Sequence, residues 1–469
     1  MLTRRSVLGL APLVFCKAAA KPKRNVLFVA IDDMNDWVGC LGGYPGVKTP
    51  HLDQLARQGV LFRSAHCAAP LCNPARAAIL TGRQPSSTGV YLNDQPYSQS
   101  PALEGVLTLN QHFKNSGYVT LGSGKIYHGT YGKFADKQGW DDYAVLKGQM
   151  KLPKEGLQGG AAAQGNFDFG PTSGGDEDMA DFDTANWVAG HLARRQPSPM
   201  FLALGITRPH LPWYVPKKYF DMYPLDAITL PIVKEDDLAD IPSAGQKMAV
   251  QNKDHARITG AEGWKKAVQA YLASITFADA MVGKVLRALE TGPHGSNTTV
   301  MLWSDHGWHL GEKNHWRKFT LWERSTRNLL MIKAPGVTTP GGLCDSAVSM
   351  MNLYPTLIDL EGLGKAGAQD GVSMLPLLRN PKAKWQRPVL TTYGRGNHTI
   401  RTGGVQAGWR YIRYADGTEE LYDRKADPNE WTNLASRPEF GSKITELGRH
   451  LPAENAPNSP RVKPDATDV

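Results

Sequence analysis

The sequence predicts an α/β fold, in which helices flank a large, mostly parallel sheet and a small antiparallel sheet follows toward the C-terminus. Four continuous apolar runs rich in β-branched residues are typical of strands buried on both faces, and they alternate with segments of helical periodicity. Beyond residue 380 the pattern changes to short alternating stretches around Asp416-Gly417, a dipeptide that favours a hairpin turn.

The elements follow in chain order. The strands of the large sheet are expected at residues 25–33, 117–125, 200–210 and 298–307. Helices are expected at 49–59, with Thr49 as N-cap and Pro50 in the first turn, and at 267–290. Residues 151–180 are rich in Gly, Asp and Gln without periodicity and predict a long surface insertion. The short C-terminal strands are expected within 387–394, 398–404 and 409–423.

Three regions are predicted: an export signal at residues 1–20, a catalytic domain at 21–380 and a C-terminal antiparallel-sheet subdomain at 381–469. Paired Arg4 and Arg5, a short apolar run and alanines ending at Ala20 resemble a twin-arginine signal, so we expect a periplasmic or secreted protein. After this segment, no apolar run is long enough to cross a bilayer, and no membrane partner is expected.

The composition, 41% hydrophobic and 21% charged, is typical of a soluble globular enzyme. Loss of the signal removes three cations (Arg4, Arg5, Lys17) and no acid, which lowers the net charge from +9 to +6. A mildly basic surface suits an anionic substrate, whereas nucleic acid is not expected because long basic runs with interleaved aromatics are missing. The remaining cysteines have neither metal-finger nor disulfide-framework spacing; they are Cys40, Cys67, Cys72 and Cys344.

Chemically useful side chains follow each expected strand of the large sheet. They are Asp32 and Asp33, Lys125 and His128, Arg208 and His210, and Asp305 and His306. In open α/β sheets, ligands bind beyond the carboxyl ends of the strands. Four separate strands therefore point to one site, and the sequence predicts an enzyme.

The segment PLCNPARAAILTGRQP, residues 70–85, places Cys72 at the start of a helix, because Pro74 suits the first turn. Free N–H groups and the helix dipole favour anions there and lower the pKa of a thiol, so a thiolate nucleophile is chemically possible. Arg76, in the same turn, can form a forked contact with the same anion or with the Cys72 side chain.

Residues 70–82 resemble the first signature of the type I sulfatase family, and the segment from Gly117 to His128 resembles the second. The stretches DDMNDW, GKIYH, RPHLPW and SDHGWHLGEKNHWRKF are most similar to the iduronate 2-sulfatases. The resemblance covers about residues 25–380 and implies an alkaline-phosphatase-like fold. Asn73 departs from the pattern, because the family usually has a small residue at that position.

The resemblance implies that Cys72 is oxidised to formylglycine by a formylglycine-generating or radical sulfatase-maturating enzyme. One hydroxyl of the hydrated aldehyde attacks the sulfate ester, and the other then releases the sulfate. The catalytic residues that the resemblance implies are Cys72, Arg76, Lys125, His128, His210 and Lys318. Among them, Lys125 and His128 match residues that bind sulfate and orient the nucleophile. His210 is the candidate acid for the leaving alcohol, and Lys318 stabilises its charge.

Three carboxylates at converging strand ends repel one another unless a cation lies among them. The resemblance implies one Ca²⁺, bound by Asp32, Asp33, Asp305, His306 and the oxygen formed at Cys72. His306 is the weakest member of this set, since hard cations normally take oxygen ligands.

Other polar and aromatic residues near the motifs are candidates for a substrate subsite, although ordinary structural roles are at least as plausible. They are Asp36, Trp37, Arg208, His309, Lys313, His315 and Arg317. The three cations among them favour a sulfated oligo- or polysaccharide that also carries carboxylates, with a 2-O-sulfated uronic acid or a similar sugar as the expected target.

Two alternatives remain open from the sequence. One is a phosphodiesterase or phosphonate monoester hydrolase of the same superfamily, because the metal site does not separate these activities. The other is an unmodified carbohydrate-binding pseudoenzyme, against which the intact active-site residues argue.

Overall fold

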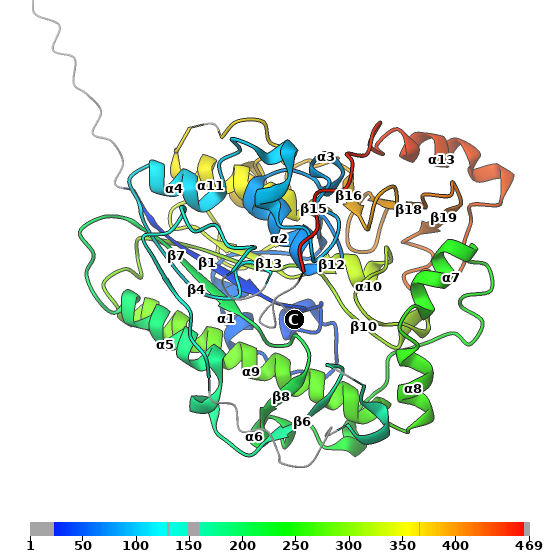
Figure 1. Ribbon diagram of the computed structural model, residues 1–469, viewed down its shortest axis with the longest axis horizontal. Coiled ribbons are helices and arrows are strands. Elements are labelled where there is room, and N and C mark those ends of the chain that lie inside the picture. Colours follow the sequence, from blue (N-terminus) through cyan, green and yellow to red (C-terminus); the bar gives the residue numbers. More distant parts are fainter. Residues whose placement is uncertain (1–22, 129–131, 149–158, 165, 365, 464–469) are drawn as a thin grey trace, which may run out of the picture.

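An eight-stranded sheet crosses the centre of the protein and carries helices on both faces (Figure 1). The computed structural model describes residues 23–128, 132–148, 159–164, 166–364 and 366–463, and the predicted export signal lies outside them. The strand order is β14-β2-β13-β9-β1-β7-β4-β5. The bounds are β1 (Asn25–Ile31), β2 (Val60–Phe62), β4 (Val119–Gly124), β5 (Asp142–Ala144), β7 (Met200–Ile206), β9 (Thr298–Ser304), β13 (Leu330–Lys333) and β14 (Gly342–Cys344).

The four strands predicted for the large sheet are confirmed as β1, β4, β7 and β9, which are neighbours at its centre and pair in parallel. Strand β13 runs antiparallel to both β9 and β2, so the sheet is mostly but not wholly parallel. Every residue of β1, β7 and β9 is buried, because helices cover both faces. This double burial explains the continuous apolar runs in the sequence.

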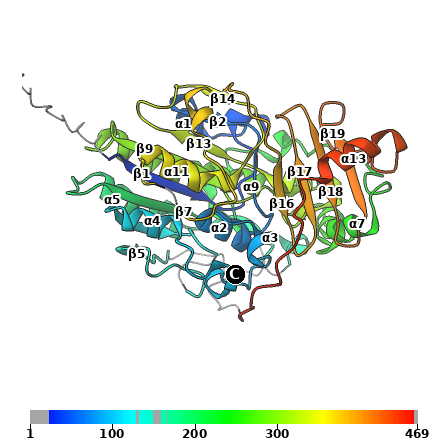
Figure 2. The ribbon, with the colours of Figure 1, turned by 90° about the horizontal axis from the view of Figure 1, so that it is seen from above.

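Alternate side chains of β1 enter two separate hydrophobic cores, one on each face of the sheet. Leu27 and Val29 belong to the first core, and Val26 and Phe28 belong to the second. The helices of the first core are α1 (Pro50–Gln58), α5 (Ala180–Leu192) and α9 (Trp264–Thr291). Those of the second are α2 (Cys72–Thr81), α4 (Leu109–Asn115), α11 (Leu353–Glu361) and α12 (Leu375–Arg379) (Figures 1 and 2).

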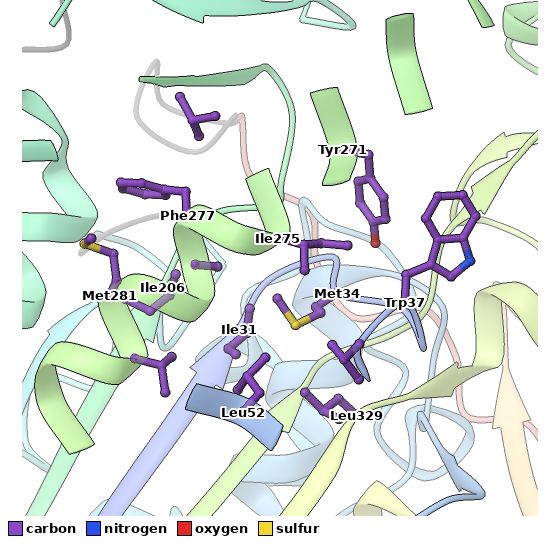
Figure 3. Close-up of a cluster of buried hydrophobic side chains, with 14 of the residues drawn as sticks. Ile31, Met34, Trp37, Leu52, Ile206, Tyr271, Ile275, Phe277, Met281 and Leu329 are labelled. Carbon is purple, nitrogen blue, oxygen red and sulfur yellow. The ribbon is translucent and has the colours of Figure 1, made fainter. Parts of the chain in front are cut away.

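Helix α9, 28 residues long, is the main cover of the first face and confirms the helix predicted at 267–290. Figure 3 shows its Ile275 and Met281 packed near Ile31 and Ile206, the last residues of β1 and β7. Close-packed apolar side chains of α9 therefore hold the carboxyl ends of these two strands in place on this face of the sheet.

Helix α1 begins at Pro50 as predicted, but the expected side-chain cap by Thr49 is wrong. The Thr49 hydroxyl instead accepts the N–H of Gly39 at 2.8 Å. The N–H groups of His51 and Leu52 donate to the buried Asp279 carboxylate of α9, at 3.1 and 2.8 Å. A neighbouring helix thus provides the acceptor that a local residue was expected to provide.

The predicted surface insertion at 151–180 is corrected for its described part, which excludes residues 149–158 and 165. Phe167 and Phe169 are buried, and Phe167 packs against Trp213 with ring centroids 5.4 Å apart. Strand β6 (Phe169–Thr172) pairs in parallel with β8 (Trp213–Pro216). Two buried aromatics in a polar, glycine-rich segment are too few to produce a recognisable period.

The small antiparallel sheet near the C-terminus is confirmed, and its strands lie in chain order. They are β16 (Val389–Thr392), β17 (His398–Arg401), β18 (Trp409–Arg413) and β19 (Glu419–Asp423), followed by α13 (Gly441–Gly448). Gly417, at φ 85°, lies in the predicted turn between β18 and β19. Buried Arg401 and Arg410 of this sheet pair with Glu323 of α10 (Glu323–Thr326) and so attach it to the rest of the protein. The domain boundary at residue 380 stays a prediction.

Short elements connect these layers. They are β3 (Ala65–His66), β10 (His309–Leu310), β11 (Trp316–Arg317), β12 (Arg327–Asn328), β15 (Val348–Ser349), α3 (Pro85–Thr88), α6 (Lys217–Phe220), α7 (Ser243–Val250) and α8 (Asp254–Gly260). Cys40, Cys67, Cys72 and Cys344 are free thiols. Within the described ranges, none of the helices combines the length and apolarity needed to span a bilayer.

We expect Asp279→Ala to lower the free energy of unfolding by about 1–2 kcal/mol, because it leaves the N–H groups at the start of α1 without their acceptor. Denaturant unfolding of the variant and the parent protein measures this difference. Asp226→Asn, at an exposed position, is the control. An unchanged unfolding midpoint for Asp279→Ala contradicts the assignment of the cap.

Candidate active site

The register between β1 and β9 brings two carboxylates side by side. Ile31 pairs with Ser304, so Asp32 and Asp305 follow directly at neighbouring strand ends. Asp33 then turns in the left-handed region, at φ 56°, and its N–H donates to Asp305 Oδ1 at 3.1 Å. Aspartate adopts this backbone conformation more readily than most residues. The three carboxylates converge as their place at the strand ends predicted, and all are completely buried.

The guanidinium of Arg76 joins these strand ends to helix α2. Its Nη2 donates to Asp32 Oδ1 and its Nε to Asp305 Oδ2, each at 3.0 Å. Its Nη1 donates to the carbonyl oxygens of Lys125 and Ile126, directly after β4. Arg76 is 1% exposed, so these charge-assisted hydrogen bonds are shielded from water. One side chain therefore fixes α2 against three strands of the sheet.

Cys72 is the first residue of α2, as predicted, and it is completely buried. Its Sγ lies 3.4 Å from His306 Nε2, 3.4 Å from Lys318 Nζ and 3.9 Å from Asp33 Oδ1. Burial by itself raises the pKa of this thiol, but Lys318 and His306 outweigh burial and hold that pKa below its usual value. Position 72 therefore lies where positive charge favours an anionic nucleophile.

Five buried side chains form a group able to hold a metal ion, and each offers one ligand atom within 4.8 Å of the others. They are Asp32, Asp33, Cys72, Asp305 and His306. Three carboxylates are the oxygen ligands that hard divalent cations take, so the donor set fits such an ion. The predicted ligand residues are all in this group.

The electrostatics of the cluster support the same fit. Burial raises the pKa of Asp33 to about 6 against the opposing effect of Lys318, and burial also raises the pKa of Asp305. Burial acts the same way on Asp32, yet Lys125 and Arg76 hold its pKa well below the usual range. Nearby cations thus outweigh burial at Asp32 but not at Asp33 and Asp305, a balance that suits an added divalent cation.

His306 contributes in a second way. Burial disfavours its imidazolium, but Asp305 and Cys72 outweigh burial and raise its pKa to about 9. Its Nε2 lies 3.4 Å from Asp33 Oδ1 and 3.6 Å from Asp305 Oδ2. Protonated, this ring supplies positive charge to the carboxylates, and it must lose that proton to ligate a metal.

The remaining predicted catalytic side chains lie around the same cluster. Lys125 pairs with Asp32, and Lys318 Nζ donates to Asp33 Oδ1 at 2.8 Å. His210 Nε2 lies 3.8 Å from Asp33 Oδ2. His128, His210 and Lys318 also line a pocket of about 470 Å³, a volume in the range of small-molecule sites. The structure thus brings together all ten residues predicted for the site.

Both histidines of the pocket have lowered pKa values, which favours the neutral form of each ring. Burial and then Lys125 lower the pKa of His128 to about 3, and burial with Lys125 and Lys318 lowers the pKa of His210 well below its usual range. The His210 Nδ1 lies 2.6 Å from the carbonyl oxygen of Leu211, so this nitrogen carries the proton. Its Nε2, on the Asp33 side of the ring, is therefore left as an acceptor.

Two of the three cations expected at the substrate subsite lie elsewhere. Arg208 is buried. Its backbone N–H donates to Asp181 Oδ2 at 2.9 Å, and its side-chain Nη1 donates to the carbonyl oxygen of His210 at 2.7 Å. Lys313 is buried against Asp237 and does not line the pocket. The Arg208 guanidinium donates to backbone carbonyl oxygens, and the Lys313 ammonium pairs with an acid far away in sequence; motif spacing reveals neither partnership. Arg317 lines the pocket as predicted.

The other candidates near the motifs are structural. His315 places its ring nitrogens against the carbonyl oxygens of Ala249 and Lys318, and His309 contacts the Thr320 hydroxyl. Trp37 packs against Tyr44 and Tyr271 in the first core. Asp36 pairs with Arg324 and Arg327. The two histidines thus support the Lys318 segment and lie outside the pocket lining.

Several pocket residues were missed by the sequence analysis. They include Asn93, Asp94, Trp308, Phe319, Tyr393 and Arg461. Trp308 lies under Lys318, whose Nζ is 5.0 Å from the ring centroid. Tyr393 and Arg461 come from the predicted C-terminal subdomain, where the sequence carries no motif. Only their position in space connects them with the site.

Two protein-family models match the sequence of this chain. The model described as Sulfatase matches residues 24–363, nearly three quarters of the chain. The chain belongs to the sulfatase family. A second model, described as N-sulphoglucosamine sulphohydrolase, C-terminal, matches residues 311–456. The protein is accordingly a sulfuric ester hydrolase, as the two sequence signatures predicted.

Relatives of known name support this membership. A sulfatase of Formosa agariphila is 38% identical over 92% of this chain and 87% of its own length. Iduronate 2-sulfatase of Mus musculus is 29% identical over 72% of this chain and 69% of its own length. A Δ4,5-hexuronate-2-O-sulfatase of Bacteroides thetaiotaomicron is 27% identical over 92% and 89%. The predicted similarity to iduronate 2-sulfatases is confirmed.

Solved structures confirm the alkaline-phosphatase-like fold of this sulfatase. One was determined in complex with its substrate D-glucosamine-2-N,6-O-disulfate and matches with a TM-score of 0.74 at 20% identity, covering 91% of this chain and 96% of its own. The phosphonate monoester hydrolase of Agrobacterium radiobacter matches with a TM-score of 0.75 at 21% identity, covering 91% and 94%. At these identities the likeness concerns the fold.

Proposed function

We propose that this sulfatase removes a sulfate ester from an acidic sulfated saccharide, with a nucleophile formed at Cys72 and a bound calcium ion. The observation that carries the proposal is the position of Cys72. Its side chain lies at the first turn of α2, between the Lys318 ammonium and the buried carboxylate cluster, and three pocket-lining residues adjoin that cluster. A nucleophile and the groups that bind an anion therefore meet at one point.

Formylglycine at position 72, when hydrated, supplies a hydroxyl nucleophile and a second hydroxyl that permits release of sulfate. The chain's own residues do the rest. Lys125 and His128 bind sulfate oxygens, and Lys318 stabilises the charge that develops during cleavage. Arg76 holds Asp32 and Asp305 and thereby fixes the start of α2, so that residue 72 keeps its orientation.

His210 is proposed as the proton donor to the leaving alcohol. Its Nε2 lies on the Asp33 side of the ring, and a sulfate anion bound nearby raises the pKa of His210, which burial lowers. The ring then takes up a proton at Nε2 and passes it to the oxygen of the departing sugar. Its Nδ1–H remains on the Leu211 carbonyl oxygen, which keeps the ring orientation constant.

We assign one calcium ion to the cluster of Asp32, Asp33, Asp305, His306 and the oxygen formed at position 72. The three buried carboxylates support a hard cation. Burial raises the pKa values of Asp33 and Asp305, and an added positive charge would favour their ionised forms. The role proposed for the ion is to hold the anionic sulfate and the nucleophile together.

The substrate proposed is a 2-O-sulfated uronic acid, or a similar sugar, at the end of an oligo- or polysaccharide. Two of the relatives are named for such targets, iduronate 2-sulfatase and Δ4,5-hexuronate-2-O-sulfatase. In the pocket, Arg317 is a side chain suited to a sugar carboxylate. Arg208 and Lys313 do not contribute, since the Arg208 guanidinium is buried against backbone carbonyl oxygens and Lys313 is buried in an ion pair with Asp237.

We also propose export to the periplasm or beyond, on the twin-arginine-like segment around Arg4 and Arg5. Maturation of Cys72 then requires a formylglycine-generating or radical sulfatase-maturating enzyme as a partner. Peptide mass spectrometry of the exported protein identifies its N-terminal residue. A mature chain that starts near Lys21 supports export, and an intact terminus beginning at Met1 contradicts it.

Peptide mass spectrometry of active protein, produced in a host with a maturating enzyme, is expected to find the aldehyde in the peptide with Cys72. Cys72→Ala is expected to lower turnover at least about 10³-fold, because the nucleophile is lost. Cys344→Ala, at another fully buried thiol, is the matched control and should retain turnover. A fully active preparation that contains only unmodified Cys72 contradicts the proposal.

Chelation is expected to abolish activity, and added Ca²⁺ to restore it. Asp305→Asn is expected to reduce turnover about 10²-fold or more, because the cluster loses charge as well as a ligand. The exposed Asp226→Asn serves as control. Recovery with Zn²⁺ and no response to Ca²⁺ would falsify the hard-cation assignment.

A panel of defined sulfated oligosaccharides tests the substrate. Release of sulfate from a terminal 2-O-sulfated uronate is expected, with much slower release from 6-O-sulfated neutral hexoses. The reverse order overturns the substrate assignment and leaves the sulfatase assignment intact. Phenylphosphonate esters belong in the same panel, because the fold is shared with a phosphonate monoester hydrolase; faster hydrolysis of the phosphonate favours the alternative activity.

A further inference from the structure

After α13 the chain returns across the catalytic region as an extended segment, residues 455–463, which we call the C-terminal strap. Figures 1 and 2 show it in red, running from α13 past α3, and in Figure 2 it ends at the edge of the molecule. Ala456, Ser459 and Val462 donate their N–H groups to the carbonyl oxygens of Ser86, Gly89 and Asp94, at 2.8, 2.9 and 2.7 Å. The prolines between these donors, Pro457 and Pro460, have no N–H that needs an acceptor.

The strap approaches its support very closely. A Cβ at Gly89 would lie 2.0 Å from the carbonyl oxygen of Pro457, and Gly89 itself has φ 75°. Gln95, which is completely buried, donates from Nε2 to the carbonyl oxygen of Ser459 at 2.9 Å. Its Oε1 accepts the N–H groups of Tyr91 and Leu92 at 2.7 and 2.8 Å. One amide therefore holds the strap and the 91–95 loop together.

The same loop is held by Asn73, the residue that departs from the family pattern next to Cys72. Its Nδ2 donates to the carbonyl oxygens of Leu92 and Gln95 at 2.8 and 2.7 Å. Its backbone N–H donates to Asn93 Oδ1 at 3.0 Å. Buried amide contacts thus run from the nucleophile helix through the loop to the strap. The position of the strap is set relative to position 72.

At the end of this path, Arg461 reaches the rim of the active-site pocket. Its Nε and Nη2 lie 2.6 and 2.5 Å from Asp94 Oδ2, and its side chain is 66% exposed. The other two cations of the pocket lining are engaged more deeply. Lys318 is buried on Asp33, and Arg317 pairs with Asp254 at 2.6 Å with its side chain 17% exposed. Arg461 is therefore the cation of this lining that a ligand can reach most freely.

We propose that Arg461 is a specificity-determining residue that binds a second oxyanion of the saccharide, beside the sulfate ester that is cleaved. This inference rests on the proposed function. A guanidinium binds carboxylate and sulfate through the same fork of N–H donors, so either group on the neighbouring position or sugar satisfies it. The amide contacts from Asn73 and Gln95 fix the origin of the arginine, and its exposed end adapts to the ligand.

The test compares three substrates with Arg461→Ala, Arg461→Lys and Arg461→Glu. The substrates are a 2-O-sulfated uronate disaccharide, the same disaccharide with its carboxylate reduced to an alcohol, and the reduced disaccharide with a second sulfate. Arg437→Ala, at an exposed position outside the pocket lining, is the matched control. Thermal unfolding checks that each variant is folded.

For Arg461→Ala, KM is expected to rise about tenfold to a hundredfold on the substrate that carries the second anion, with kcat changed little. Arg461→Glu raises KM further, and Arg461→Lys recovers part of the loss. The reduced monosulfated substrate shows a much smaller change, and comparison of the carboxylate and disulfate arms identifies which anion is bound.

Equal KM changes on all three substrates, or no change on any of them, overturn the inference while the proposed function stands. A parent protein that cleaves none of these saccharide sulfates overturns the proposed function and this inference with it. The two failures are therefore distinguishable.

Discussion

The contact of the Arg76 guanidinium with Asp32 and Asp305 is the interaction on which the active site depends. These carboxylates end two neighbouring strands, and both are completely out of water. Loss of one partner of such a buried pair typically costs about 3–5 kcal/mol, because the other charge remains uncompensated. Since the same guanidinium also binds the backbone after β4, it fixes the start of α2 to the edge of the sheet where Cys72 is needed.

The excess of buried negative charge explains the rest of the site. Lys125 and Lys318 each pair with a carboxylate of the cluster, and His306 is drawn toward its charged form by the same carboxylates. Burial and neighbouring lysines lower the pKa values of the histidines on the pocket side, His128 and His210. The two sides of position 72 therefore differ electrostatically, one suited to a cation and the other to an anionic ester.

The residues proposed for catalysis come from about the first two thirds of the chain, and the C-terminal region adds residues to the rim of the pocket. Every residue proposed for the chemistry lies before residue 320; most follow strands of the large sheet or begin α2, and Lys318 follows β11 of the two-stranded sheet β10-β11. The rim of the pocket also takes Tyr393 and Arg461 from the C-terminal region. Bond cleavage requires a rigid arrangement, which strand ends provide, whereas a binding rim on extended chain is able to vary while the chemistry is kept.

The sequence by itself predicted the central strands, the place of Cys72 at a helix start and ten site residues that the structure brings together. Parallel strands end at one edge, so residues such as Asp32 and Asp305 meet wherever these strands are neighbours. Only the tertiary structure decided which cations are free. The Arg208 guanidinium binds backbone carbonyl oxygens and Lys313 pairs with Asp237, while Asp279 of α9 accepts the N–H groups at the start of α1. Gln95 and Ser459, or Asp94 and Arg461, are joined across most of the chain. Periodicity and motifs record local preferences, whereas these partnerships depend on which distant surfaces packing brings together.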